Sequence, residues 1–145
     1  MSTETLTRAL LHPKAVALVG ASADPNKNTG RPQRFLKTHG FQGRIIPINP
    51  NRDKVQGLPA YPSLADAPGP IDHAFIMVPA PHVPAVITDC AAAGVLVCTI
   101  YTDGFAETGA AGKALQEEIV QIARDAGMRL IGPNSMGVID TRAGM

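Results

Sequence analysis

Five short apolar runs recur along the chain, and they constrain its fold more than any other feature. The runs are rich in β-branched residues, nearly continuous, and bounded by Gly, Pro or Asn. Strands that are buried on both faces of a parallel sheet have this pattern. The sequence therefore predicts five buried strands, which are "AVALVG" (15–20), "RIIPIN" (44–49), "HAFIMV" (73–78), "VLVCTI" (95–100) and "RLIG" (129–132).

Helical patterns separate these runs. Apolar residues with helical spacing extend over 83–91 and 115–126, and a glycine soon follows each series. A weaker pattern covers 31–40 with Pro32 in its first turn, and 63–67 has room for one short turn. The order β-α-β-α-β-α-β-α-β, joined by right-handed crossovers, predicts an α/β fold. This is a Rossmann-like, doubly wound parallel sheet of five strands with helices on both faces.

Composition and charge narrow the function. The 145 residues suit one domain, which we place at 12–145 behind an N-terminal segment at 1–11. A formal net charge of +1 and the lack of a long apolar run argue against nucleic acid and membrane as partners. The N-terminus does not resemble a secretory signal, so we expect a cytoplasmic protein. Cys90 and Cys98 have no paired spacing, and we expect core residues rather than a disulfide scaffold or a metal site.

The segments after the five predicted strands are small, polar or proline-rich. In an open α/β sheet, ligands bind outside the carboxyl ends of the strands, near the point where the strand order reverses. We therefore expect a ligand at this edge, although glycines and prolines that only punctuate the elements would give part of the same pattern. The segments read "GASADPNKNTG" (20–30), "NPNRDKVQG" (49–57), "VPAPHVP" (78–84), "YTDGFAETG" (101–109) and "GPNSMG" (132–137).

The first of these segments occupies the phosphate-cradling position between a strand and a helix. Gly20 allows close approach of the backbone to a ligand, Ser22 can donate a hydroxyl, and Gly30 leaves the helix entry open. Lys27 could approach a pyrophosphate. The pattern is not G-x-G-x-x-G, so alone it is a weak motif.

The second segment departs from a classical NAD site, which has an acidic residue at the end of the second strand. Asn49 and Pro50 stand there instead, and Arg52 and Lys54 follow. A basic residue at this place fits a ribose phosphate, which both NADP and coenzyme A carry, although a solvated arginine on a turn is the alternative.

The third segment has two prolines directly after a strand. Val78, Pro79 and Ala80 would form a stiff apolar wall along a ligand, unless the prolines only start the next helix.

Taken together, the loops resemble a known family. "KAVALVGAS", "PINPNRDKVQGLPAYPSL", "IMVPAPHV", "YTDGFAETG" and "RLIGPNSMGVI" are similar to the coenzyme A-binding domain of NDP-forming (ADP-forming) acyl-CoA synthetases, relatives of the succinyl-CoA ligase α subunit. The resemblance covers roughly residues 12–140. The family often has Ser-Ala-Gly-Phe where this chain has "TDGF", and Cys in place of Ser135. The resemblance implies that coenzyme A contacts Gly20, Ala21, Ser22, Arg52, Val78, Pro79, Tyr101, Thr102 and Asp103, with Lys54 as the alternative to Arg52.

The same resemblance implies partners. The family's phosphorylated histidine lies in a following domain, and a separate ATP-grasp module or subunit handles the nucleotide. His12, His39, His73 and His82 do not lie in a glycine-rich relay loop, so we expect no catalytic residue and no activity from the isolated chain. Two alternatives stay open, namely an NADP-binding Rossmann module and a coenzyme A-binding regulatory or acetyltransferase-associated domain.

Overall fold

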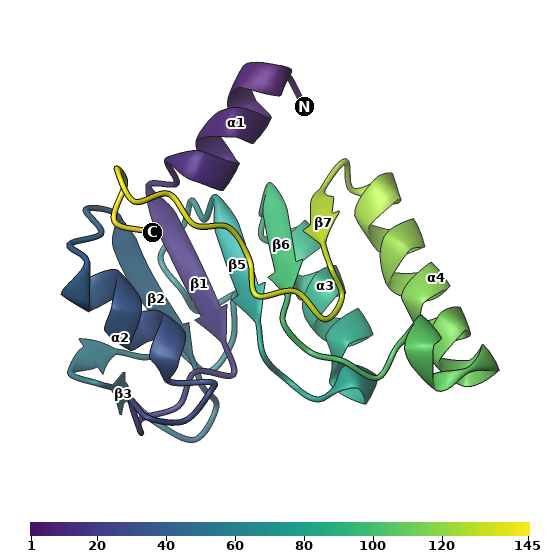
Figure 1. The fold of residues 1–145 in the computed structure, drawn as a ribbon, viewed down its shortest axis with the longest axis horizontal. Helices are drawn as coiled ribbons and strands as arrows, with labels where there is room; N and C mark the ends of the chain where they lie inside the picture. The colour runs from purple at the N-terminus through teal and green to yellow at the C-terminus, as the bar shows by residue number, and fades with distance from the viewer.

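A computed structural model describes all of residues 1–145 and has a five-stranded parallel sheet at its centre (Figure 1). The strand order is β2-β1-β5-β6-β7. All five predicted strands are confirmed; four end one or two residues before the predicted limit, and the fourth strand along the sequence ends at its limit but begins two residues later than predicted. The strands are β1 (Ala15–Val19), β2 (Arg44–Ile48), β5 (His73–Ile76), β6 (Val97–Ile100) and β7 (Arg129–Ile131).

Three long crossover connections carry helices, at the places where the periodicity predicts them. These helices are α2 (Arg31–Thr38), α3 (Val83–Ala92) and α4 (Ala110–Asp125). The short helices η1 (Ala80–His82) and η2 (Ala106–Thr108) precede α3 and α4. No helix combines the length and the apolar character needed to cross a bilayer.

Strand β1 lies between β2 and β5, and its residue Val16 pairs with Ile45 on one side and His73 on the other. The chain moves outward in one direction from β1 to β2 and then in the other direction from β5 to β7. The strand order therefore reverses between β1 and β5, which is the place where ligands of this architecture bind.

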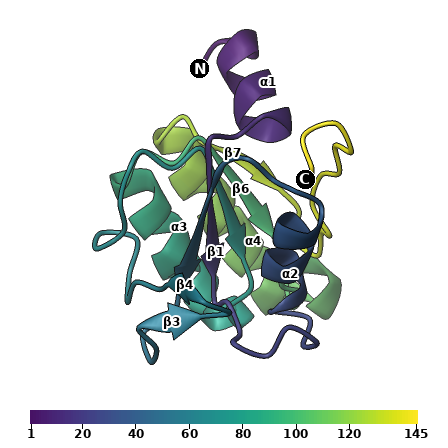
Figure 2. The ribbon, with the colours of Figure 1, turned by 90° about the vertical axis from the view of Figure 1, so that its left-hand side faces the viewer.

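Side chains of β1 alternate between two cores. Ala15, Ala17 and Val19 belong to a cluster of 19 buried residues beneath α3 and α4. Val16 and Leu18 belong to a cluster of only six on the opposite face. That face is covered by α2 and by the C-terminal segment that follows β7 (Figure 2). The two faces are thus filled to very different degrees.

The N-terminal segment is a helix, α1 (Thr3–Leu11), where the sequence reading expected only a segment. The Ser2 side chain accepts a hydrogen bond from the Thr5 N–H and caps this helix. Arg8 forms an ion pair with Asp72 at 2.6 Å, which fastens α1 to the start of β5. A tertiary contact over so long a sequence separation leaves no local sign in the sequence.

The connection from β2 to β5 differs from the prediction as well. The one turn predicted over 63–67 is present as a hydrogen-bonded turn rather than a helix, since the Ala67 N–H donates to the Leu64 carbonyl at 3.3 Å and the Ser63 hydroxyl donates to Asp66 at 2.6 Å. Pro68 disfavours the helical conformation at Ala67, so the turn does not extend into a helix. A small hairpin of β3 (Lys54–Val55) and β4 (Leu58–Pro59) precedes it.

Candidate functional site

The loops at the carboxyl edge of the sheet are joined to one another by direct contacts. Asn49, after β2, donates from Nδ2 to the Ala21 carbonyl after β1 at 2.9 Å. Gly20 has a φ of +87°, and a Cβ at this position would lie 3.2 Å from a Val78 methyl group and 3.3 Å from the Met77 carbonyl. The loops after β2, β1 and β5 therefore form one continuous surface at the switch point.

The remaining loops extend the same series. The Thr102 hydroxyl, after β6, donates to the Val78 carbonyl at 2.6 Å. The Asn134 N–H, after β7, donates to the Thr102 carbonyl at 3.0 Å. All five segments that the sequence singled out are thus brought to one edge and linked.

The long first loop is folded back on itself. A Cβ on Gly30 would collide with the carbonyl oxygen of Asp24, so only glycine allows the loop to close before α2. Gln56, in the β3–β4 hairpin, donates from Nε2 to the carbonyls of Ser22 and Gly30, each at 2.9 Å. Sequence reasoning missed Gln56, whose only local sign is its place before Gly57 at a hairpin turn.

Several groups of the first loop have no partner within the chain. The N–H groups of Ala21 and Ala23 donate to no acceptor of the chain, and the exposed Lys27 ammonium forms no ion pair. Ser22 accepts from the Asp24 N–H at 3.1 Å, which leaves its hydroxyl proton free. These donors suit an anionic ligand such as a phosphate.

The second loop contains one side chain that is hydrogen-bonded within the chain and several that are exposed. Asn49 uses both ends of its amide, since Oδ1 accepts from the Asn51 N–H at 2.9 Å. Pro50, Arg52 and Lys54 are exposed, and neither basic side chain forms an ion pair or hydrogen bond. Both cations remain available, so the alternative between Arg52 and Lys54 stays open.

The third and fourth loops are in direct contact with each other. Pro79 is exposed, and Ala80 lies against Gly104, whose hypothetical Cβ would be 3.2 Å from that of Ala80. The Tyr101 ring packs on Phe75 at 5.9 Å between centroids, while Asp103 is exposed. The Tyr101 ring therefore lies on the α2 face of the sheet, although the residue belongs to the loop at the carboxyl edge.

Glu107 holds the fourth loop closed. Its Oε1 accepts from the Gly104 N–H at 2.6 Å. Hydrogen bonds from the backbone of Glu107 itself, Gly104 and Phe105 lower the pKa of this exposed carboxyl below its usual value. The ionised carboxylate of Glu107 thus stabilises the conformation of the fourth loop.

Three of the four histidines lie away from these loops, and the fourth, His82, is exposed in the third loop and takes part in none of the side-chain contacts described above. His73 is buried and lies 2.8 Å from the Thr99 hydroxyl through Nε2. Burial lowers the pKa of His73 to about 4, against smaller opposing effects of the Ala9 backbone and the Asp72 carboxylate. Cys90 and Cys98 are buried in the larger core, as predicted, and no group of three or more potential ligands is placed to hold a metal ion.

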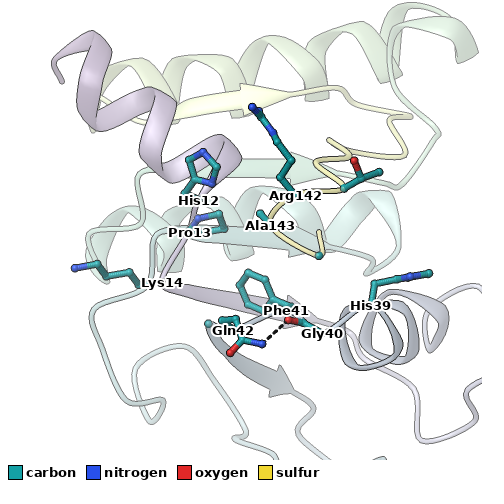
Figure 3. Close-up of a pocket in the computed structure, with 12 residues that line it drawn as sticks. His12, Pro13, Lys14, His39, Gly40, Phe41, Gln42, Arg142 and Ala143 are labelled. Atoms are coloured by element: carbon teal, nitrogen blue, oxygen red, sulfur yellow. Dashed lines mark hydrogen bonds between the residues drawn. The ribbon is translucent and has the colours of Figure 1, made fainter.

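A hollow of about 420 Å³ lies at the opposite, amino-terminal edge (Figure 3). His12, Lys14, His39 and Arg142 line it, but Figure 3 shows Lys14 and His39 pointing away from its centre in different directions. Its basic groups do not converge on one point, so this hollow does not compete with the carboxyl edge as a binding site.

Comparison with known proteins identifies the ligand of this architecture. Residues 14–141 match the family described as "CoA binding domain". The chain belongs to this family. Coenzyme A is therefore the ligand that its fold is built to hold, and the match favours coenzyme A over NADP.

Two curated relatives of this CoA-binding domain are ADP-forming acetate–CoA ligases. Ligase II of Archaeoglobus fulgidus is 42% identical over 94% of this chain and 20% of its own length. The α subunit of ligase II of Pyrococcus furiosus is 40% identical over 92% of this chain and 29% of its own.

The apo structure of the dinucleotide-forming acetyl-coenzyme A synthetase 1 of Ca. Korarchaeum cryptofilum has the same fold. It superposes with a TM-score of 0.90 at 41% identity, over 97% of this chain and 30% of that protein. The CoA-binding domain thus spans between a fifth and a third of the length of these relatives.

Proposed function

We propose that this chain is the coenzyme A-binding module of an NDP-forming acyl-CoA ligase. The observation that carries the proposal is the hydrogen-bonded series of five loops at the switch point, in a chain about 40% identical to ligase segments. The rest of such a ligase would supply a nucleotide site and a phosphoryl-relaying nucleophile, in an ATP-grasp module and a further ligase domain or in separate subunits.

In this proposal the first loop receives the phosphates. The free N–H groups of Ala21 and Ala23 and the Lys27 ammonium bind the pyrophosphate, and the Ser22 hydroxyl adds a further donor. Gly20 and Gly30 keep the loop in its closed form. Asn49 acts as a positioning residue, since its amide is fully engaged with Ala21 and Asn51.

The remaining loops bind the rest of the cofactor. Arg52 pairs with the ribose-linked phosphate from its position after Pro50. Val78, Pro79 and Ala80 form an apolar wall along the pantetheine arm. Tyr101, Thr102 and Asp103 bound its far end, where Thr102 fixes the distance to Val78.

The isolated chain binds coenzyme A but makes no thioester. Phosphoryl transfer depends on cations and metal ions positioned around the phosphates. The four histidines of this chain are spread over its elements and do not gather at the carboxyl edge. An assay with ATP or GTP, Mg²⁺, coenzyme A and short acids should give no turnover above a heat-inactivated control.

Calorimetric titration tests the binding proposal directly. Coenzyme A, dephospho-coenzyme A, NADP and ADP are titrated side by side into the chain. Coenzyme A should bind most tightly, since among these ligands only it has both the ribose-linked phosphate proposed for Arg52 and the pantetheine arm proposed for the loop after β5. Tighter binding of NADP would contradict the proposal.

Arg52→Ala tests the assignment of the ribose phosphate. Loss of one charge-assisted contact should weaken coenzyme A by about tenfold. Dephospho-coenzyme A should bind the variant and the parent alike. If both ligands lose equal affinity, Arg52 does not contact that phosphate, and Lys54→Ala is the next variant.

A further inference from the structure

A cavity of about 480 Å³ opens on the α2 face of the sheet, and Tyr101 is the one residue that it shares with the contacts proposed for coenzyme A. Its floor is the sheet, one wall is α2, and the other wall is the C-terminal segment over 136–145. Most of the lining is apolar, including Leu18, Phe75 and Tyr101. The volume lies within the roughly 300–1,000 Å³ of small-molecule pockets.

Three of the four exposed large apolar side chains of the chain gather at this cavity, and the fourth is the N-terminal Met1. Phe35 is 48% exposed, Met136 89% and Ile139 84%, and all three line the same cavity. Single exposed apolar residues are ordinary, whereas a cluster around a hollow is typical of a binding surface. An apolar body of a ligand would cover them.

Two arginines stand in the wall formed by α2. Arg31 donates from Nε to the Asn26 carbonyl at 3.2 Å, and Arg34 donates from Nη1 to Asn26 Oδ1 at 2.9 Å. One asparagine thus tethers both guanidinium groups. Neither arginine forms an ion pair with a carboxylate of the chain. Their remaining N–H groups suit a carboxylate, which guanidinium binds in a two-pronged geometry.

The cavity also adjoins the carboxyl edge. Tyr101, the first residue after β6, lines the cavity and belongs to the fourth loop. Asn28 lines the cavity and belongs to the first loop. A molecule in the cavity would therefore lie beside the region proposed for coenzyme A.

We infer that this cavity, which we call the acid cavity, binds a carboxylic acid with an apolar body of aromatic or medium-chain size. The carboxylate lies at Arg31 and Arg34, and the apolar body lies on Phe75 and Tyr101. The inference rests on the proposed function, since a ligase of this kind needs an organic acid near coenzyme A. Acetate would leave most of the apolar lining uncovered.

Calorimetric titration of the purified chain with defined probes tests the acid cavity. The probes are cinnamate, octanoate, acetate and cinnamamide, which is the neutral counterpart of cinnamate. Cinnamate and octanoate should bind, cinnamamide should bind at least about tenfold more weakly than cinnamate, and acetate should show no heat of binding. Equal binding of cinnamate and cinnamamide, or no binding of cinnamate, would overturn the inference.

A charge-removing variant adds a matched comparison. R31Q/R34Q should weaken cinnamate about tenfold or more and leave cinnamamide unchanged. Arg124→Gln removes the same kind of group from α4, outside the acid cavity, and should change neither. Thermal melting of each variant reports whether it is folded. The comparison of cinnamate with cinnamamide uses the parent chain, so it tests the inference even if a variant fails to fold.

The position of the ligand and its relation to coenzyme A complete the test. Amide NMR signals of Tyr101 and of 136–139 should shift on addition of cinnamate, and signals of α4 should not. Displacement of cinnamate by saturating coenzyme A would assign the arginines to a coenzyme A phosphate and overturn the inference. If coenzyme A binds and cinnamate does not, the proposed function stands and the inference of an acid-binding cavity is rejected. If cinnamate binds and coenzyme A does not, only the proposed function is rejected.

Discussion

The two faces of the sheet are made from the same strands but packed in different ways. The face under α3 and α4 is closed by 19 buried residues, whereas the face under α2 has six and the acid cavity. One face supplies most of the apolar burial that holds the fold. The other leaves open space and free cations beside the loops. Stability and binding are thus separated to opposite sides of a single layer.

The largest test of this separation compares one core residue from each side. Ile119→Ala, in the closed face, should cost about 4 kcal/mol of unfolding free energy, and Leu36→Ala, in the open face, about 2 kcal/mol. The truncation at Leu36 enlarges a space that already exists, so fewer packing contacts are lost. Urea unfolding at pH 7 measures both values, and equal losses would refute the difference between the faces.

Acid should weaken the chain through its open face, because the buried His73 lies there. Its pKa is about 4 in the folded chain and 6.5 as the ordinary value, so the unfolded chain binds the extra proton between these limits. Stability is therefore constant above pH 6.5 and falls as the pH drops from 6.5 towards 4. The loss amounts to about 3 kcal/mol.

Urea unfolding at a series of pH values between 7 and 4 measures this loss. His73→Gln should flatten the curve in that window, and His82→Gln, an exposed position, should leave it unchanged. The carboxyl groups of Glu107 and Asp140 have lowered pKa values, so their stabilising effect is lost only as the pH falls towards and below their ordinary values of 4.5 and 3.8, at the acid end of this series. A parent curve that is flat from pH 6.5 to 4.5 would show that His73 is solvated.

The smallest test adds one methylene on each side of β1. Val19→Ile overfills the closed face and should cost about 1 kcal/mol, while Val16→Ile extends into the acid cavity and should gain about 0.5 kcal/mol. Both positions lie on the same strand and both are almost fully buried. Thermal unfolding of the two variants side by side gives the sign of each change, and a loss at both positions would show that the open face is already full.

The sheet was predictable because each strand carries its pattern within a few residues. The apolar runs gave all five strands, and the helical spacing gave α3 and α4. The docking of helix α1 onto the sheet, in contrast, involves an ion pair between residues 64 positions apart. The β3–β4 hairpin depends equally on distant contacts, since Gln33 donates to the Val55 carbonyl at 2.8 Å.

The candidate site was predictable to the level of loops but not of roles. Topology alone brings the segments after the strands to one edge, so their proximity follows from the strand order. The role of each residue within these loops does not follow from the strand order. The sequence predicts Asn49 and Thr102 as ligand contacts, and the structure adds that their side chains bond neighbouring loops. Arg31 and Arg34 were absent from the predicted site, because their tether to Asn26 is a matter of side-chain geometry.

The double hydrogen bond of Gln56 has a consequence for transplanting this loop. The carbonyls of Ser22 and Gly30, at the ends of a nine-residue segment, accept from one amide nitrogen that belongs to another part of the chain. Extra residues inserted between them would have to bulge outward without separating the ends. A designer who grafts residues 20–30 onto another Rossmann-like scaffold would therefore have to include the β3–β4 hairpin as well. The transferable unit is the loop together with Gln56 and the hairpin that holds it.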